Sequence, residues 1–199
     1  MPHNPDNYED INAQSFWVGL QGSGGPGIVQ SVLKWEESGG VWGWYIYAEY
    51  NLNNSGYIHN PPQAVAEGDI IEGTMYIAAG DTGDGDAWYI NAYDEDSGVS
   101  ANFTVYDGSS NLPFTSANLG VLETHALVAC DGLSLSDSER FTLSTLTEEG
   151  TAWNDYVDVS GLVTPTNSYG GVPPSCGWDA AHYDTSGVRS ALLSWVWTD

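Results

Sequence analysis

The chain has 199 residues, enough for one domain with a substantial buried core, and 41% of them are hydrophobic. Its net charge is −24, with Lys34, Arg140 and Arg189 as the basic residues. This argues against nucleic acid or an anionic membrane as a partner, because phosphate recognition needs clustered cations. No run approaches the roughly 18 apolar residues of a transmembrane helix. The polar residues 1–10 lack the apolar centre of a signal peptide, so we expect an extracellular location if a leader has been removed and a cytoplasmic one otherwise.

Short runs rich in Val, Ile, Tyr and Trp, bounded by Gly, Asn, Asp and Pro, recur along the chain, and no long run has the period of a helix. Strands are predicted at residues 15–20, 28–35, 41–50, 69–79, 87–94, 100–106, 126–130, 141–146 and 192–198. This spacing favours an all-β fold, a two-sheet antiparallel β-sandwich. We expect one sandwich domain, residues 15–199, after an N-terminal arm, residues 1–14. Residues 161–180 are rich in Pro, Gly and Ser and are expected to form a long loop.

The run at 42–47 alternates with a period of two, so neighbouring side chains point to opposite faces of the predicted sheet. Trp42, Trp44 and Ile46 are expected on one face, and Tyr45 and Tyr47 on the other. One of these two faces would belong to the core of the sandwich.

A group of motifs resembles the glutamic peptidase (eqolisin) family. Residues 16–22 read FWVGLQG and residues 28–31 read IVQS, similar to the family's WVG turn and its following Ile-Leu/Val-Gln strand. Weaker matches follow in the same order at 43–45, 65–70 and 88–106, and the resemblance covers about residues 15–135. It implies a concanavalin-like pair of curved antiparallel sheets with a groove across the concave face.

The family's chemistry, as the resemblance implies it, uses a Glu that activates water and then protonates the leaving amine, and a Gln that donates to the oxyanion. Gln30 matches the Gln. Cys130 takes the position of the Glu, and Asp131, one residue later, would point to the opposite face unless a bulge re-aims it. Gln21 and Ile46 take two further positions that are acidic in the family. The pattern predicts a member that has lost its catalytic acid, with Cys130 as a buried thiol or a disulfide partner of Cys176.

A groove lined by aromatic rings and amides, with few charges, is suited to a flat organic ligand. We therefore expect non-enzymatic binding of a small organic molecule, either an aromatic pigment or a saccharide. The expected ligand-binding residues are Trp17, Gln21, Gln30, Trp42, Trp44, Trp88 and Cys130. Two alternatives stay open: an acid endopeptidase that uses Gln30 with a nearby carboxylate, Asp131 or Glu123, at about pH 3 to 4, and a lectin.

An oxygen-rich loop at 81–86 is a weaker candidate for a calcium site, because carboxylates and backbone carbonyls are the ligands that Ca²⁺ prefers. Its candidate ligands are Asp81, Asp84 and Asp86. The alternative is a solvated hairpin turn in a chain rich in Asp.

Overall fold

A computed structural model describes twelve segments of the chain, and every regular element in them is a strand. The described residues are 4–5, 13–22, 27–51, 57–77, 87–106, 114–125, 138–143, 147–148, 151–152, 163–167, 179–185 and 188–194. No helix in these segments is long and apolar enough to cross a membrane.

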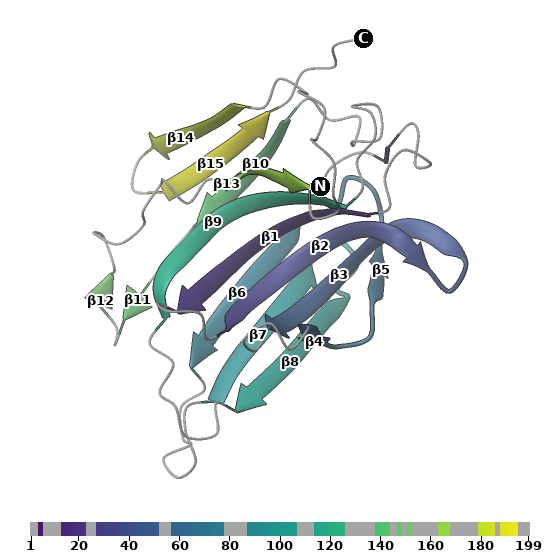
Figure 1. Cartoon of the computed structure of the whole chain (residues 1–199), viewed down its shortest axis with the longest axis horizontal. Helices are drawn as coiled ribbons and strands as arrows, with labels where there is room; N and C mark the ends of the chain where they lie inside the picture. The colour runs from purple at the N-terminus through teal and green to yellow at the C-terminus, as the bar shows by residue number, and fades with distance from the viewer. Residues whose placement is uncertain are drawn as a thin grey trace.

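The described strands form a large sheet and three smaller ones (Figure 1). The large sheet has the order β13-β9-β1-β2-β3-β4, and β5 pairs with the other half of β3. The smaller sheets have the orders β6-β7-β8, β10-β15-β14 and β11-β12. All strand pairs are antiparallel except β13 with β9. The strands are β1 (Ala13–Gly22), β2 (Ile28–Ser38), β3 (Val41–Asn51), β4 (Tyr57–His59), β5 (Gln63–Val65), β6 (Ile71–Ile77), β7 (Ala87–Asp94), β8 (Ser100–Tyr106), β9 (Phe114–His125), β10 (Ser138–Leu143), β11 (Thr147–Glu148), β12 (Thr151–Ala152), β13 (Val163–Asn167), β14 (Asp179–Thr185) and β15 (Val188–Ser194).

A tight hairpin joins β2 to β3 and fixes the register of the centre of the large sheet. Gly39 and Gly40 form its turn with φ of 62° and 84°, a conformation that glycine adopts at little steric cost. Two successive positive φ values match the turn whose twist suits a two-residue hairpin. The pairing then runs without a break from Ser38–Val41 to Ile28–Asn51.

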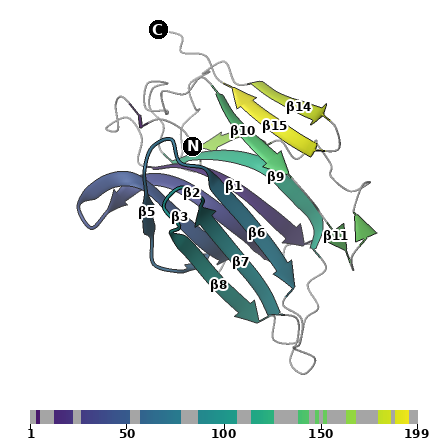
Figure 2. The same ribbon diagram turned by 180° about the vertical axis from the view of Figure 1, so that it is seen from behind.

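The β6–β8 sheet packs against one face of the large sheet, called here the inner face (Figures 1 and 2). Val29, Ala48 and Tyr50 of the inner face form a buried cluster with Trp88 and Ile90 of β7. Burial of such aromatic and aliphatic side chains is the main favourable contribution to the free energy of folding.

The approach of the two layers is close enough to require a glycine on β6. A Cβ at Gly73 would lie 2.7 Å from Val18 Cγ2 and 2.9 Å from Ser31 Oγ. The side chains of β1 and β2 therefore fill the space that any other residue at position 73 would need.

The structure confirms the predicted all-β sandwich of antiparallel sheets. The predicted strands 87–94 and 100–106 coincide with β7 and β8 residue for residue. The prediction of one long loop at 161–180 is wrong, because β13 pairs with β9 inside that range. The predicted strand at 126–130 lies outside the described residues, and β9 (Phe114–His125), which precedes it, was not predicted.

Candidate functional site

The second face of the large sheet carries polar side chains among its aromatic ones and is called here the Gln30 face. The register pairs Gln30 with Glu49 and Val32 with Tyr47, so these four side chains leave the sheet on the same side. They alternate along β2 and β3 with the residues of the inner face. The site therefore follows from the period of two and from the register that the Gly39-Gly40 turn sets.

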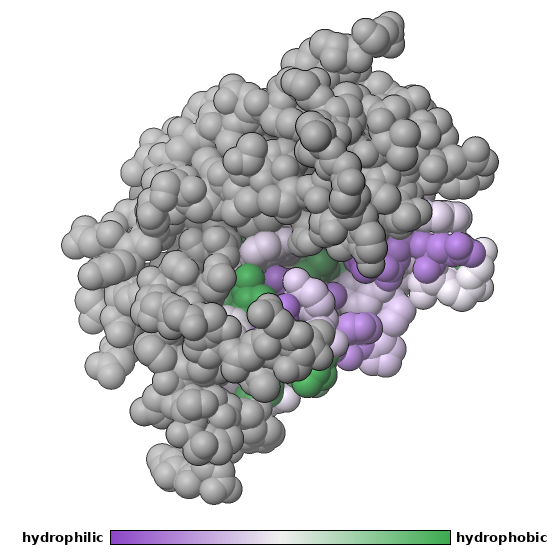
Figure 3. Space-filling view, in the orientation of Figure 1, coloured by the Kyte–Doolittle hydropathy of each residue, from purple (hydrophilic) through white to green (hydrophobic). Residues whose placement is uncertain are grey.

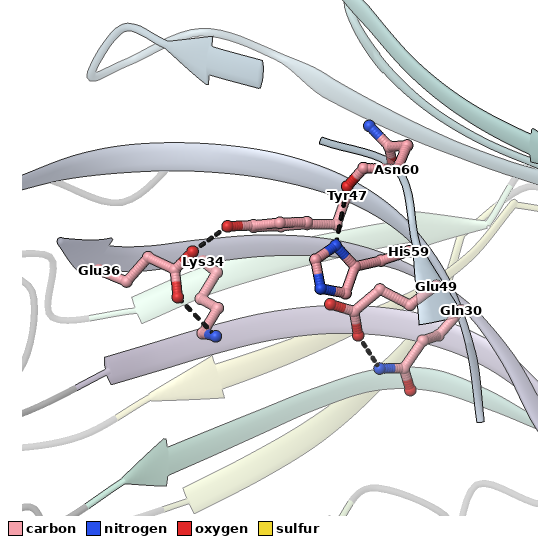
Figure 4. Close-up of polar contacts among 7 residues, drawn as sticks. All are labelled: Gln30, Lys34, Glu36, Tyr47, Glu49, His59 and Asn60. Atoms are coloured by element: carbon pink, nitrogen blue, oxygen red, sulfur yellow. Dashed lines mark hydrogen bonds and ion pairs between the residues drawn. The ribbon is translucent and has the colours of Figure 1, made fainter. Parts of the chain in front are cut away.

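Gln30 and Glu49 form a buried pair at the centre of this face (Figure 4). Gln30 Nε2 donates a hydrogen bond of 2.7 Å to Glu49 Oε2. The two side chains are 4% and 8% exposed, respectively. The amide nitrogen of Gln30 has two hydrogens, so one remains for another acceptor after the bond to Glu49 is made.

Burial raises the pKa of the Glu49 carboxyl above its ordinary value of 4.5, because desolvation disfavours its charged form. The hydrogen bond from Gln30 and the nearby Lys34 and His59 act in the opposite direction, and Glu36 acts in the same direction as burial. Glu49 is therefore a carboxyl that takes up a proton at a higher pH than an exposed glutamate. Such a group can exchange protons with a reacting molecule in mildly acidic solution.

Lys34, Glu36 and Tyr47 form a charged network next to this pair (Figure 4). Lys34 Nζ lies 2.6 Å from Glu36 Oε2, and the Tyr47 hydroxyl donates a hydrogen bond to Glu36 Oε1. Lys34 Nζ also lies 5.9 Å from the centroid of the Tyr47 ring, within the range of a cation–π contact. The network extends toward the β2–β3 hairpin, where Figure 3 shows hydrophilic residues gathered at the surface.

His59 on the edge strand β4 is the cross-strand neighbour of Glu49. Its Nδ1 lies 2.8 Å from the backbone oxygen of Asn60, which can only accept, so Nδ1 carries the hydrogen. Its ring contacts the Tyr47 ring edge-on, with centroids 5.2 Å apart. A positive charge on this ring favours the ionised form of Glu49 and lowers its pKa.

Trp17 of β1 completes the aromatic part of the Gln30 face. It packs against the buried Val32, Tyr45 and Tyr47. Its ring also lies over Gly19, the cross-strand partner of Gln30: a Cβ on Gly19 would lie 3.2 Å from Trp17 Cζ3 and 3.2 Å from Gln30 Cβ. The structure thus brings two residues predicted for the site, Trp17 and Gln30, close together.

Three other predicted aromatic residues lie away from Gln30. The prediction that Trp44 and Trp42 share its face is wrong, because the register directs even-numbered residues of β3 to the inner face. There Trp44 is 2% exposed and contacts Trp35 with ring centroids 5.4 Å apart, and Trp42 stacks on Trp35 at 6.4 Å. Trp88 lies in the buried cluster between the two sheets.

Glu49 was missed, and the acidic position was assigned to Ile46 instead. Ile46 is fully buried on the inner face, whereas Glu49 lies opposite Gln30. The Gln30 face therefore does hold a carboxylate. The sequence of the hairpin could have predicted this result, because counting residue pairs outward from the Gly39-Gly40 turn places Glu49 opposite Gln30. Gln21 pairs with Ile28 at the end of β1.

The remaining predicted site residues lie outside the described part of the chain. They are Asp81, Asp84, Asp86, Cys130 and Asp131. The possible disulfide partner, Cys176, lies outside it as well.

Within the described residues, Asp69, Asp94 and Asp96 are the group of carboxylates close enough together to hold a metal ion. They already bind backbone amides of the surrounding turns. Asp69 Oδ2 accepts from the Ala66 N–H at 2.9 Å, and Asp96 Oδ2 accepts from the Ile70 N–H at 2.9 Å. These hydrogen bonds to the turns give the carboxylates a structural role that explains why they lie close together.

Comparison with known proteins gives one informative match. The crystal structure of aspergilloglutamic peptidase from Aspergillus niger matches with a TM-score of 0.57 and 19% sequence identity, over 93% of this chain and 99% of that one. No protein-family model matches the sequence. No curated protein matches it either. At this identity the likeness concerns the fold, which is glutamic-peptidase-like.

Proposed function

We propose that this chain, which has a glutamic-peptidase-like fold, hydrolyses peptide bonds in acidic solution with Gln30 and Glu49 as its catalytic residues. The observation that carries the proposal is the 2.7 Å hydrogen bond between a buried amide and a buried carboxyl whose pKa is raised. An amide donor and a proton-exchanging carboxyl are the two functions that acid hydrolysis of an amide requires.

The chemistry follows from the atoms of the pair. The Glu49 carboxylate takes a proton from a water molecule, whose oxygen attacks the carbonyl carbon of the substrate. The second N–H of the Gln30 amide donates to the oxyanion that develops on the carbonyl oxygen. The C–N bond then breaks as the protonated Glu49 gives its proton to the leaving amine.

The raised pKa changes the expected pH range. A base must be ionised to act, so activity should fall as pH drops through the pKa of Glu49. Because that pKa lies above 4.5, we expect the acid limb at a higher pH than the 3 to 4 inferred from ordinary carboxylates.

The test is cleavage of a mixed peptide library by the purified protein between about pH 2 and 8, read by mass spectrometry of new termini. Gln30→Ala should reduce cleavage about 10²–10³-fold, the usual cost of losing one oxyanion donor. Gln63→Ala is the matched control, since it removes an amide from β5 of the same sheet. Absence of cleavage at every pH, or equal cleavage by Gln30→Ala, would sink the proposal.

A second candidate is the binding of a small organic ligand on the Gln30 face, favoured by one observation at Trp17. Its Nε1 is buried and has no hydrogen-bond partner within the described part of the chain. An indole N–H left unpaired costs free energy that a ligand acceptor would recover. The test is the native mass and absorbance of the protein from its natural source. Excess mass or visible absorption that disappears on denaturation supports this candidate, and a colourless protein of calculated mass counts against it.

A further inference from the structure

The outer face of the β6–β8 sheet lies on the side of the molecule that Figure 2 turns to the viewer. On β7 the burial alternates, so Trp88, Ile90 and Ala92 point to the core. Tyr89 and Tyr93 therefore point outward. This surface is called here the Tyr89 face, and it lies on the opposite side of the second sheet from the Gln30 site.

Two aromatic platforms lie along this face. Tyr76 of β6 and Tyr89 of β7 are direct cross-strand partners with ring centroids 5.0 Å apart and planes at 39°. Tyr76 is 48% exposed. Tyr93 lies four residues beyond Tyr89 on β7, about 13 Å along the strand. Rings spaced in this way can each cover one ring of an extended ligand.

Amides lie between these platforms. Asn91 is between Tyr89 and Tyr93 on β7, and its cross-strand partner on β8 is the exposed Asn102. The Asn91 side-chain oxygen is buried and has no hydrogen-bond partner in the described segments. An unpaired amide oxygen is costly, and a ligand hydroxyl could satisfy it after a rotation of the soft amide torsion.

The charges on this face decide the ligand class. No Lys, Arg or His occurs in β6, β7 or β8, and the chain as a whole has a net charge of −24. Phosphate or carboxylate ligands would be repelled. The exposed Glu72, the cross-strand partner of Tyr93, adds a negative charge to the same face. The other groups, ring faces with amides and hydroxyls, match a neutral sugar polymer, whose C–H faces stack on aromatic rings and whose hydroxyls bond to amides.

We propose that the Tyr89 face binds a neutral polysaccharide, with Tyr76, Tyr89 and Tyr93 stacking on its sugar rings and Asn91 bonding to its hydroxyls. This site lies on the face of the β6–β8 sheet that points away from the large sheet, whereas Gln30 and Glu49 belong to the large sheet. It is independent of peptide hydrolysis, and Gln30→Ala should bind polysaccharide as the wild type does.

The experiment is native gel electrophoresis in gels that contain laminarin, xyloglucan, galactomannan or hydroxyethyl cellulose, with alginate as the anionic comparison. We expect retardation by at least one neutral polymer and none by alginate. Tyr76→Ala should weaken that binding several-fold, and the Tyr76→Ala/Tyr89→Ala double variant at least tenfold. Circular dichroism checks that each variant folds. Tyr76→Ala alone alters a half-exposed side chain, so it serves if the double variant fails to fold.

Tyr57→Ala is the matched control, because Tyr57 is 50% exposed but lies on β4 of the other sheet. It should bind as the wild type does. The proposal is overturned if no neutral polymer retards the protein or if Tyr76→Ala binds as tightly as Tyr57→Ala. It is also overturned if the variants leave polysaccharide binding unchanged but alter the oligomeric state measured by sedimentation, because this face would then be a contact between copies of the chain.

Discussion

Two buried carboxyl groups in this molecule have pKa values shifted in opposite directions. Glu49 on the Gln30 face is 8% exposed, and Asp94 at the end of β7 is fully buried. Burial raises the pKa of Glu49 above 4.5. Burial also opposes ionisation of Asp94, but hydrogen bonds from the hydroxyl and backbone N–H of Ser97 and from the backbone N–H of Asp96 lower its pKa below 3.8.

The number of hydrogen-bond donors accounts for this difference. Asp94 Oδ1 accepts from the backbone N–H groups of Asp96 at 2.9 Å and Ser97 at 3.3 Å, and Oδ2 accepts from the Ser97 hydroxyl. Glu49 accepts one bond from Gln30 within the described residues. A carboxylate with several donors is stabilised as the anion and organises a turn, whereas one with a single donor keeps its affinity for a proton.

The largest effect is expected from removal of Asp94. Asp94→Ala leaves two backbone N–H groups and a hydroxyl without their acceptor, which should lower the free energy of unfolding by about 1–3 kcal/mol at neutral pH. Because the folded-state pKa is lowered, the wild-type advantage exists above pH 3.8 and is lost as pH falls through the folded-state value. Urea unfolding at several pH values measures this.

Glu95→Ala is the control for Asp94→Ala, since Glu95 is exposed in the same turn and its backbone N–H, which the substitution keeps, donates to the Ile70 oxygen. It should leave stability nearly unchanged. A destabilisation by Asp94→Ala that is equal at pH 3 and pH 7 would show that its charge has no part in the turn.

A smaller effect of opposite sign is expected from Glu49→Gln, which keeps an acceptor oxygen for Gln30 but cannot ionise. With a raised folded-state pKa, the stability that Glu49 contributes is present below pH 4.5 and is lost as pH rises through the folded-state value. The variant should match the wild type near pH 4 and exceed it at pH 7 by on the order of 1 kcal/mol, or about 2–4 °C in Tm. A variant less stable than the wild type at pH 7 would contradict the raised pKa.

The smallest effect is expected from His59→Ala. The charge of His59 lowers the pKa of Glu49, so its removal should raise that pKa further. The shift should be visible in a ¹³C NMR titration of the Glu49 carboxyl, identified by comparison with Glu49→Gln. Tyr57→Ala, on the same strand, should leave the titration unchanged. A downward shift in His59→Ala would contradict this account of the neighbouring charges.

Much of the fold could be predicted from the sequence, because local patterns determine it. Runs of β-branched and aromatic residues gave β7 and β8 their bounds, and the period of two separated Trp44 from Tyr45 correctly. The parallel pairing of β13 with β9 was missed, because it joins segments far apart in the chain and leaves no short-range signal.

The site was predicted only in part, for a different reason. Period alone says that Trp44 and Tyr45 face apart, but not which face meets the second sheet. Trp44 was therefore assigned to the groove, although the β6–β8 sheet packs on its side of the large sheet. Glu49 was missed because the family's Ala-Trp-Tyr-Glu motif was aligned by residue type alone, which placed its acidic position at Ile46. The register set by the Gly39-Gly40 turn places Glu49 opposite Gln30.

The central claim, that Glu49 is a catalytic carboxyl, is tested most directly by the rates of peptide cleavage by the wild type, Glu49→Gln and Glu37→Gln across acidic pH. Glu37 is an exposed glutamate of β2, so its variant removes the same charge elsewhere on the hairpin. We predict cleavage by the wild type and by Glu37→Gln, and a loss of at least about 100-fold in Glu49→Gln. Equal rates in all three proteins, or no cleavage by any of them, would contradict the claim.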